Sequence, residues 1–159
     1  MPYQLRPVRS AEDWHALHGM RRDVLFTPER HAIAYDEDHP DDRSEQNIPF
    51  LLVFDSRPIG TARLDLRGKV AVERLVAIVP DEQGKGHGRK LDALLEAEAR
   101  RRGVTHLRVN AAPDAVGYYE KTGWRRADWD RKELVGLAQD AVQMTKELSP
   151  DHPLPGSPG

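Results

Sequence analysis

Three glycines alternate with polar residues at positions 84, 86 and 88, directly before an amphipathic segment typical of a helix. Glycines leave the backbone of a turn uncovered, so its N–H groups can converge on an anion, and a helix N-terminus adds partial positive charge. Further hydrogen-bond donors lie in the same stretch, at Gln83, Lys85 and Arg89. A flexible linker is the alternative, but a linker would not adjoin a regular strand and a regular helix. The pattern therefore predicts a site for a phosphate or a pyrophosphate.

The two common nucleotide motifs do not fit this loop. A Walker A loop needs a Ser or Thr directly after its Lys to hold a magnesium ion, whereas Lys90 is followed by Leu91. A Rossmann fingerprint has the spacing Gly-x-Gly-x-x-Gly after the first strand of a parallel unit. Here the glycines are evenly spaced and follow several predicted strands. A nucleotide-binding regulator is therefore a disfavoured interpretation.

The segments before the loop predict a small antiparallel sheet. Residues 3–8 are expected to form an edge strand, because Pro7 cannot donate a hydrogen bond into a central ladder. Ser10 and Asp13 have the spacing of a helix N-cap, and apolar residues follow at near-helical period through Leu25. Three strand candidates come next, at residues 50–54, 59–66 and 70–79. Together they predict an antiparallel meander that ends at the glycine loop.

The segments after the loop predict two helices with a strand between them. A leucine-rich stripe at helical spacing indicates a helix from Arg89 to Arg102. Residues 106–111 are predicted to form a short strand. Asp114 is placed to cap a second helix that ends near Thr122.

The composition fits one ordinary globular domain. The chain has 159 residues, a formal net charge of -2 and no cysteine, which excludes disulfides, thiolate metal sites and a cysteine nucleophile. The near-neutral charge gives no argument for nucleic-acid or membrane binding, and no signal peptide or membrane span is evident, so a cytoplasmic location is expected. We expect a single domain over residues 1–148, with a last strand from about Val142, and a proline-rich flexible tail over residues 149–159.

The glycine loop resembles a motif of the GCN5-related N-acetyltransferase (GNAT) superfamily. That motif reads Gln/Arg-x-x-Gly-x-Gly/Ala, and Gln83, Gly86 and Gly88 occupy its defined positions. Upstream, residues 76–80 (Val-Ala-Ile-Val-Pro) are similar to the fourth strand of the superfamily and the proline that ends it.

The resemblance continues downstream of the loop. Asn110-Ala111 and residues 115–124 (Ala-Val-Gly-Tyr-Tyr-Glu-Lys-Thr-Gly-Trp) are similar to the superfamily segment Asn-Ala … Ala-x-x-Phe-Tyr-Glu-Lys-x-Gly-Phe. Residues 59–63 and 142–146 resemble a bacterial subgroup of small GNAT proteins. The match extends over residues 20–148, approximately, and the loop with the downstream segment at the correct separation is a specific signal.

This resemblance implies the GNAT fold, which is α/β (α+β) with a mixed, mostly antiparallel sheet, a splay between strands 4 and 5, and flanking helices. It also implies acetyl-CoA as co-substrate, bound in the splay, with no metal. The coenzyme-binding positions carried over are Val76, Ala77 and Ile78 for the pantetheine arm, Gln83, Gly84, Lys85, Gly86, His87, Gly88 and Arg89 for the pyrophosphate, and Asn110, Tyr118 and Lys121 on the other side. His87 occupies a free position of the motif, so its side chain is expected to be exposed.

Two proton-handling residues are also implied by the resemblance. Tyr119 matches the position that commonly protonates the CoA sulfur, and its alternative role is to pack as a half-buried aromatic residue. Glu73 is the candidate base, acting through a water, although a residue of the 27–49 loop could serve instead. The alternative for Glu73 is an ion pair with Arg63 across the hairpin, and both roles could hold together.

The acceptor is expected to be an amine. Six carboxylates lie between Asp36 and Glu45, where GNAT proteins place a variable substrate-binding loop, and they would attract a cation. A solvated run of charges is the alternative. His31 and His39 lack the tight spacing of metal ligands, so no metal site is expected.

These expectations define one function and one rival. The function is that of an acetyl-CoA-dependent N-acetyltransferase. The acceptor is a primary amine of a small molecule, a peptide N-terminus or a lysine. This amine attacks the thioester directly, because the chain has no cysteine that could carry the acetyl group. The rival is a non-catalytic acyl-CoA-binding sensor of the same fold. The resemblance also allows a homodimer.

Overall fold

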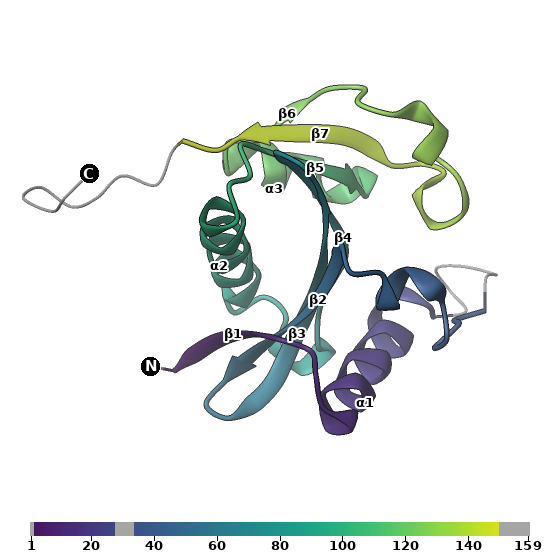
Figure 1. Ribbon diagram of the computed structural model, residues 1–159, viewed down its shortest axis with the longest axis vertical. Coiled ribbons are helices and arrows are strands. Elements are labelled where there is room, and N and C mark those ends of the chain that lie inside the picture. The colour runs from purple at the N-terminus through teal and green to yellow at the C-terminus, as the bar shows by residue number, and fades with distance from the viewer. Residues whose placement is uncertain (1, 28–33, 150–159) are drawn as a thin grey trace, which may run out of the picture.

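The first four strands pair in chain order and form the antiparallel meander that the sequence predicts (Figure 1). In the computed structural model, which describes residues 2–27 and 34–149, these strands are β1 (Tyr3–Pro7), β2 (Asn47–Phe54), β3 (Arg57–Arg67) and β4 (Val70–Ile78). β1 lies at an edge of the sheet, as expected from Pro7. β2 begins earlier than predicted, because its first residues pair with β3 beyond the end of β1.

Three further strands extend the sheet on the other side of β4. β5 (His106–Ala111) runs parallel to β4, and β7 (Val142–Glu147) is antiparallel to β5. β6 (Arg125–Arg126) pairs with β7 at the far edge and has no counterpart among the predicted strands, since two residues carry no readable alternation. The order β1-β2-β3-β4-β5-β7-β6 is a mixed, mostly antiparallel sheet, as expected.

The helices begin close to the predicted positions, but the side-chain cap predicted for the last helix is absent. α1 (Ala11–Met20) has the capping box predicted from Ser10 and continues into a π-helical turn (Arg21–Leu25). α2 (His87–Arg101) is the predicted leucine-rich helix, and α3 (Val116–Lys121) follows β5. The prediction that Asp114 caps this last helix is wrong. Asp114 lies within a 3₁₀ turn (Pro113–Ala115), and the residue that precedes α3 makes no side-chain cap.

α1 and α2 cover opposite faces of the sheet and create two separate cores (Figure 1). The larger core packs α2 and α3 on one face, with Leu91 and Leu95 fully buried against Leu64 and Leu107. The smaller core packs α1 on the other face. Burial of such side chains stabilises a fold by about 1.5–3 kcal/mol each. The proline-rich tail prediction concerns residues 150–159, which lie outside the described residues.

Candidate active site

β4 and β5 separate soon after they pair. Their parallel ladder joins Val70–Glu73 to His106–Val109. Among the described residues, no strand pairs with this edge of β4 beyond Glu73. The expected splay between strands 4 and 5 is therefore present. An unpaired strand edge offers N–H and C=O groups that an extended ligand can bind as an added strand.

A β-bulge lies in β4 where the two strands separate. Leu75 and Val76 together oppose the single residue Ala62 of β3. Leu75 has a φ of 54°, in the left-handed region, which costs a non-glycine residue about 1–3 kcal/mol and is enriched at functional sites. The sequence gives no signal for this bulge, because leucine is not a residue that favours the left-handed conformation.

The hydrogen bonds at the end of β4 show which residues face the splay. The N–H of Val79 donates to β3, whereas the carbonyl of Ile78 accepts a hydrogen bond of 2.8 Å from Gln83 Nε2. Successive residues of a strand direct their backbone groups to alternate edges. Val76 and Ile78 therefore direct theirs toward the splay, while Ala77 directs its own toward β3.

A glycine turn leads from β4 into α2. Gly84 and Gly86 have φ values of 77° and 88°, a left-handed conformation that glycine adopts without steric cost. Gly86 is the residue that precedes α2. A Cβ added at Gly84, Gly86 or Gly88 would meet no atom within 4 Å, so the space over this backbone is open. An uncovered turn at the N-terminus of a long helix is the geometry that an anion cradle requires.

The polar side chains around the turn have partners within the protein. Gln83 uses its amide to fasten the turn to the end of β4. Lys85 pairs with Glu82 at 3.0 Å and is exposed. The guanidinium of Arg89 lies 5.9 Å from the ring centroid of Tyr118. Lys85 and Arg89 remain cations near the turn, whereas Gln83 is a structural anchor.

His87 is buried, so the prediction that it is exposed is wrong. Only 6% of the residue is accessible, and its ring lies against Tyr3 and Phe54 with centroid separations of 5.6 and 4.8 Å. The reason is tertiary, because β1 and the end of β2 lie against the first turn of α2. The backbone of His87 belongs to the turn while its side chain belongs to the interior.

Glu73 is buried without a hydrogen-bond partner. It is 2% exposed, and neither carboxylate oxygen has a partner within the described part of the chain. Burial is the main cause that raises its pKa well above the ordinary value, and the carboxylates of Asp92 and Glu96 add to it, while Lys146 opposes it. These effects favour the uncharged acid.

The alternative ion pair between Glu73 and Arg63 is wrong. In the β3–β4 register Glu73 faces Leu64, whereas Arg63 faces Arg74. Because successive side chains of a strand point to opposite faces, Glu73 points toward α2 and Arg63 points toward the other face.

Arg63 instead belongs to a buried ion-pair network on the α1 face. Asp42 accepts a hydrogen bond of 2.9 Å from Arg63 and one of 2.8 Å from Arg21 of the π-helical turn. Asp65 accepts from Arg63 at 2.7 Å. Burial opposes ionisation of Asp42, but the two arginines outweigh it and lower the pKa of that carboxyl. One carboxylate of the acidic stretch is therefore structural.

The same network reaches the splay through Arg74 and Glu133. Arg74 lies directly before the bulge and binds Asp65 at 2.7 Å and both oxygens of Glu133 at 2.8 Å. Glu133 also accepts a hydrogen bond of 3.1 Å from Asn110, whose carbonyl oxygen accepts from Gln143 at 3.0 Å. Both ends of the Asn110 side chain are thus engaged within the protein. The sequence does not single out Glu133, because it lies in a polar connection without regular pattern.

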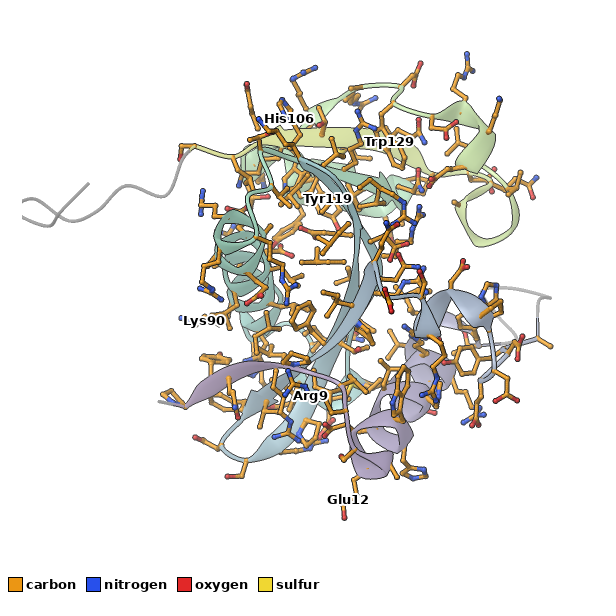
Figure 2. All side chains as sticks on the ribbon, viewed as in Figure 1. Arg9, Glu12, Lys90, His106, Tyr119 and Trp129 are labelled. Atoms are coloured by element: carbon orange, nitrogen blue, oxygen red, sulfur yellow. The ribbon has the colours of Figure 1, made fainter. Side chains whose placement is uncertain are left out.

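Tyr119 lies in the interior, between α2 and the sheet (Figure 2). It is 9% exposed and packs edge-on against Trp124 at 5.2 Å, so the packing role expected for it is present. No hydrogen bond involves its hydroxyl within residues 2–27 and 34–149. Burial is the main cause that raises the pKa of this tyrosine, and the nearby Glu73 carboxyl adds to it.

The neighbouring tyrosine has a partner. The hydroxyl of Tyr118 donates to Asp92, and burial raises the pKa of both groups, that of Asp92 to about 6. Lys121, at the end of α3, is exposed. The structure therefore brings Glu73 of β4, Tyr119 of α3 and Asp92 of α2 into one electrostatic group.

The remaining carboxylates of the acidic stretch are exposed, at Asp36, Glu37, Asp38, Asp41 and Glu45. His39 is exposed beside Asp41, and His31 lies outside the described residues. Residues 2–27 and 34–149 hold no group of three or more side chains that could bind a metal ion. Within the same ranges, no helix has the length and apolar character to cross a membrane.

The comparisons with known proteins agree on one family. Residues 28–148 match the family model described as an acetyltransferase (GNAT) domain. A candidate acetyltransferase of Bacillus subtilis (strain 168) is 25% identical over 144 residues, which cover 90% of this chain and 95% of that protein.

Solved structures share the fold over nearly the whole chain. A candidate N-acetyltransferase of Lactobacillus plantarum has a TM-score of 0.73 and 25% identity, covering 94% of this chain and 100% of that one. The PaiA N-acetyltransferase of Thermoplasma acidophilum, solved in complex with coenzyme A, has a TM-score of 0.66 and 19% identity, covering 92% and 99%. The splayed sheet, the glycine turn and the matched domain together show that the chain belongs to the GNAT acetyltransferase family, whose enzymes are N-acetyltransferases.

Proposed function

We propose that this protein transfers an acetyl group from acetyl-CoA directly to a primary amine of a small molecule, a peptide N-terminus or a lysine. One observation carries the proposal. The same strand, β4, has an open edge from Glu73 onward and ends in an uncovered glycine turn at the N-terminus of α2. A ligand with an extended amide-containing arm and a pyrophosphate can therefore bind along one continuous piece of backbone.

The residues on this piece of backbone fit coenzyme A. Val76 and Ile78 would bind the pantetheine arm, although the carbonyl of Ile78 is already occupied by Gln83. The amides between Gly84 and Arg89 would hold the pyrophosphate, because no side chain covers the glycines. A bound coenzyme A in the related PaiA structure supports the same ligand class.

Three further positions would line the coenzyme site from the opposite side. Tyr118 and Lys121 lie on α3, and Asn110 lies on β5. Asn110 would act as a wall of the splay, since its amide is held by neighbouring side chains.

Two side chains of this protein would handle protons. A thioester already carries an activated acyl group, so the protein must mainly position an uncharged amine and supply a proton to the leaving sulfur. The raised pKa of Tyr119 keeps its hydroxyl protonated, as a donor must be. Glu73 would accept the amine proton through a water, and its raised pKa makes it a stronger base once it is ionised.

The exposed carboxylates of the 36–45 stretch would draw the acceptor amine toward the protein. Their charge favours a cationic amine at long range. The buried Asp42 would anchor this stretch to Arg21 and Arg63 rather than contact the acceptor.

The test uses the purified chain in two steps. Calorimetric titration with acetyl-CoA, ATP and NAD should show a preference for acetyl-CoA, and a preference for either nucleotide would contradict the proposal. A library of primary amines is then screened for release of free CoA thiol in the presence of acetyl-CoA. Turnover with at least one amine is expected. Tight acetyl-CoA binding with no turnover of any amine would favour the acyl-CoA sensor.

A further inference from the structure

We propose that His87 is a positioning residue for the glycine turn. It acts through a row of contacting side chains that runs from Tyr3 through His87 to Glu82. This inference rests on the proposed function, because it assigns the turn to the pyrophosphate of coenzyme A. The motif leaves position 87 free, so the role belongs to this chain's own residues.

The three residues come from three different elements. The Tyr3 hydroxyl on β1 lies 2.6 Å from His87 Nδ1, at the first position of α2. On the other side of the ring, His87 Nε2 lies 3.3 Å from an oxygen of Glu82, in the 3₁₀ turn (Pro80–Glu82) that follows β4. Both ring nitrogens of a buried histidine therefore have a polar neighbour.

One neutral form of the imidazole suits both contacts. With the proton on Nε2, Nδ1 can accept a hydrogen bond from the Tyr3 hydroxyl, and Nε2 lies within ion-pair distance of the Glu82 carboxylate. Glu82 uses its other oxygen to accept from Lys85 at 3.0 Å. These contacts connect two residues of the turn region with the edge strand β1.

The turn is consequently held at both ends and open in the middle. At its start, Gln83 donates to the carbonyl of Ile78 at 2.8 Å. At its end, His87 is fixed by Tyr3 and by the ring of Phe54 at 4.8 Å. Between them lies a backbone with left-handed glycines, which is conformationally free when nothing holds it. Fixing both ends reduces the ordering that a bound pyrophosphate would otherwise have to impose.

An apolar residue at position 87 would fill the same space but could not orient the turn. The aromatic surroundings of Tyr3 and Phe54 would accept a phenylalanine, whereas only a side chain with two opposed polar atoms can join Tyr3 to Glu82. Burying a polar ring has a cost unless it is hydrogen-bonded, so its presence here indicates a positional role.

Three variants separate this role from simple packing. His87→Phe keeps the ring and removes both polar contacts, Tyr3→Phe removes one hydroxyl, and the double variant combines them. His106→Phe is the matched control, because it replaces a histidine near the top of Figure 2, away from the first turn of α2, which Lys90 marks. All are compared at a temperature where circular dichroism shows them folded.

Two readouts are measured on each variant. One is the Kd of CoA by calorimetry, and the other is the NMR order parameter of the backbone amides of residues 84–88 relative to residues 91–99 in the protein without ligand. A neutral hydrogen bond contributes about 1 kcal/mol, so each single variant should raise the Kd about fivefold. The order parameters of residues 84–88 should fall, while those of residues 91–99 stay unchanged. The double variant should bind no more weakly than His87→Phe, because both act on one chain of contacts.

The possible outcomes are distinguishable. An unchanged Kd and unchanged order parameters in both single variants would overturn the positioning role, as would an equal effect in His106→Phe or lower order parameters spread over all of α2. If the unsubstituted protein binds no CoA, the proposed function fails. The order parameters of residues 84–88 then still show whether His87 holds the turn.

Discussion

The carboxylate of Glu133 is bonded to Arg74 on β4 and, at the same time, to Asn110 on β5. Two hydrogen bonds of 2.8 Å come from the guanidinium of Arg74, and one of 3.1 Å comes from the Asn110 amide. One side chain from the connection between β6 and β7 therefore joins the two strands that border the splay, beyond the end of their own ladder at Glu73 and Val109. Bidentate pairs of this kind restrict geometry as well as adding stability.

Replacing Glu133 with glutamine should loosen the splay. We expect a loss of about 1–2 kcal/mol in the free energy of unfolding, measured by urea denaturation, and a raised KM for acetyl-CoA. The loss is moderate because the side chain is 25% exposed and Arg74 keeps Asp65 as a partner. Glu120→Gln breaks an exposed pair with Arg126 and should change stability by less than about 0.5 kcal/mol. Equal effects of the two substitutions would contradict the bridging role.

A side chain at Gly88 should block coenzyme A without unfolding the protein. Gly88 lies in the first turn of α2 with an ordinary helical conformation, and a Cβ there meets no protein atom within 4 Å. Gly88→Val should therefore keep the melting temperature within a few degrees and weaken CoA binding more than about tenfold by calorimetry, a loss of about 1.4 kcal/mol. Gly19→Val, in α1 and equally unobstructed, is the control that should bind CoA normally. Normal binding by Gly88→Val would refute the cradle.

The stability of the protein should depend on pH through Glu73. Its pKa is raised in the folded state above the ordinary value of 4.5, so the folded protein holds this proton more tightly than the unfolded chain. That contribution is fully present below pH 4.5 and is lost as pH rises through the folded pKa. Glu73→Gln has no such loss. Its melting temperature should therefore rise relative to that of the unsubstituted protein as pH increases. A melting-temperature difference that stays constant from acidic to alkaline pH would contradict the buried-acid assignment.

Tyr119 and Glu73 should affect the chemical step rather than coenzyme binding. Tyr119→Phe should lower kcat about 100-fold with an accepted amine, while the Kd of CoA remains near that of the unsubstituted protein. Glu73→Gln should lower kcat and remove the acidic limb of the pH–rate profile. Because a base must be deprotonated to act, the raised pKa of Glu73 places that limb above pH 4.5. An unchanged profile in Glu73→Gln would assign the base to the 27–49 loop instead.

Local patterns predicted most of the elements and the place of the glycine turn. Ser10 caps α1 as its spacing indicates, and α2 begins at the glycines that precede the leucine stripe. The antiparallel meander follows from alternating residues and short turns, both of which are local features. The cap predicted at Asp114 failed because a 3₁₀ turn comes between that residue and the helix.

The sequence by itself thus determined the order of elements, the family and the open glycine turn, because each depends on residues close together in the chain. The tertiary structure alone decided how the side chains around the splay are used. Strand register placed Glu73 and Arg63 on opposite faces of the sheet, and a bulge formed at Leu75, where β4 separates from β5. Packing of β1 against α2 buried His87, and Glu133 found its partners across the splay. These contacts join distant segments, and a one-residue change of register would move every such side chain to the other face.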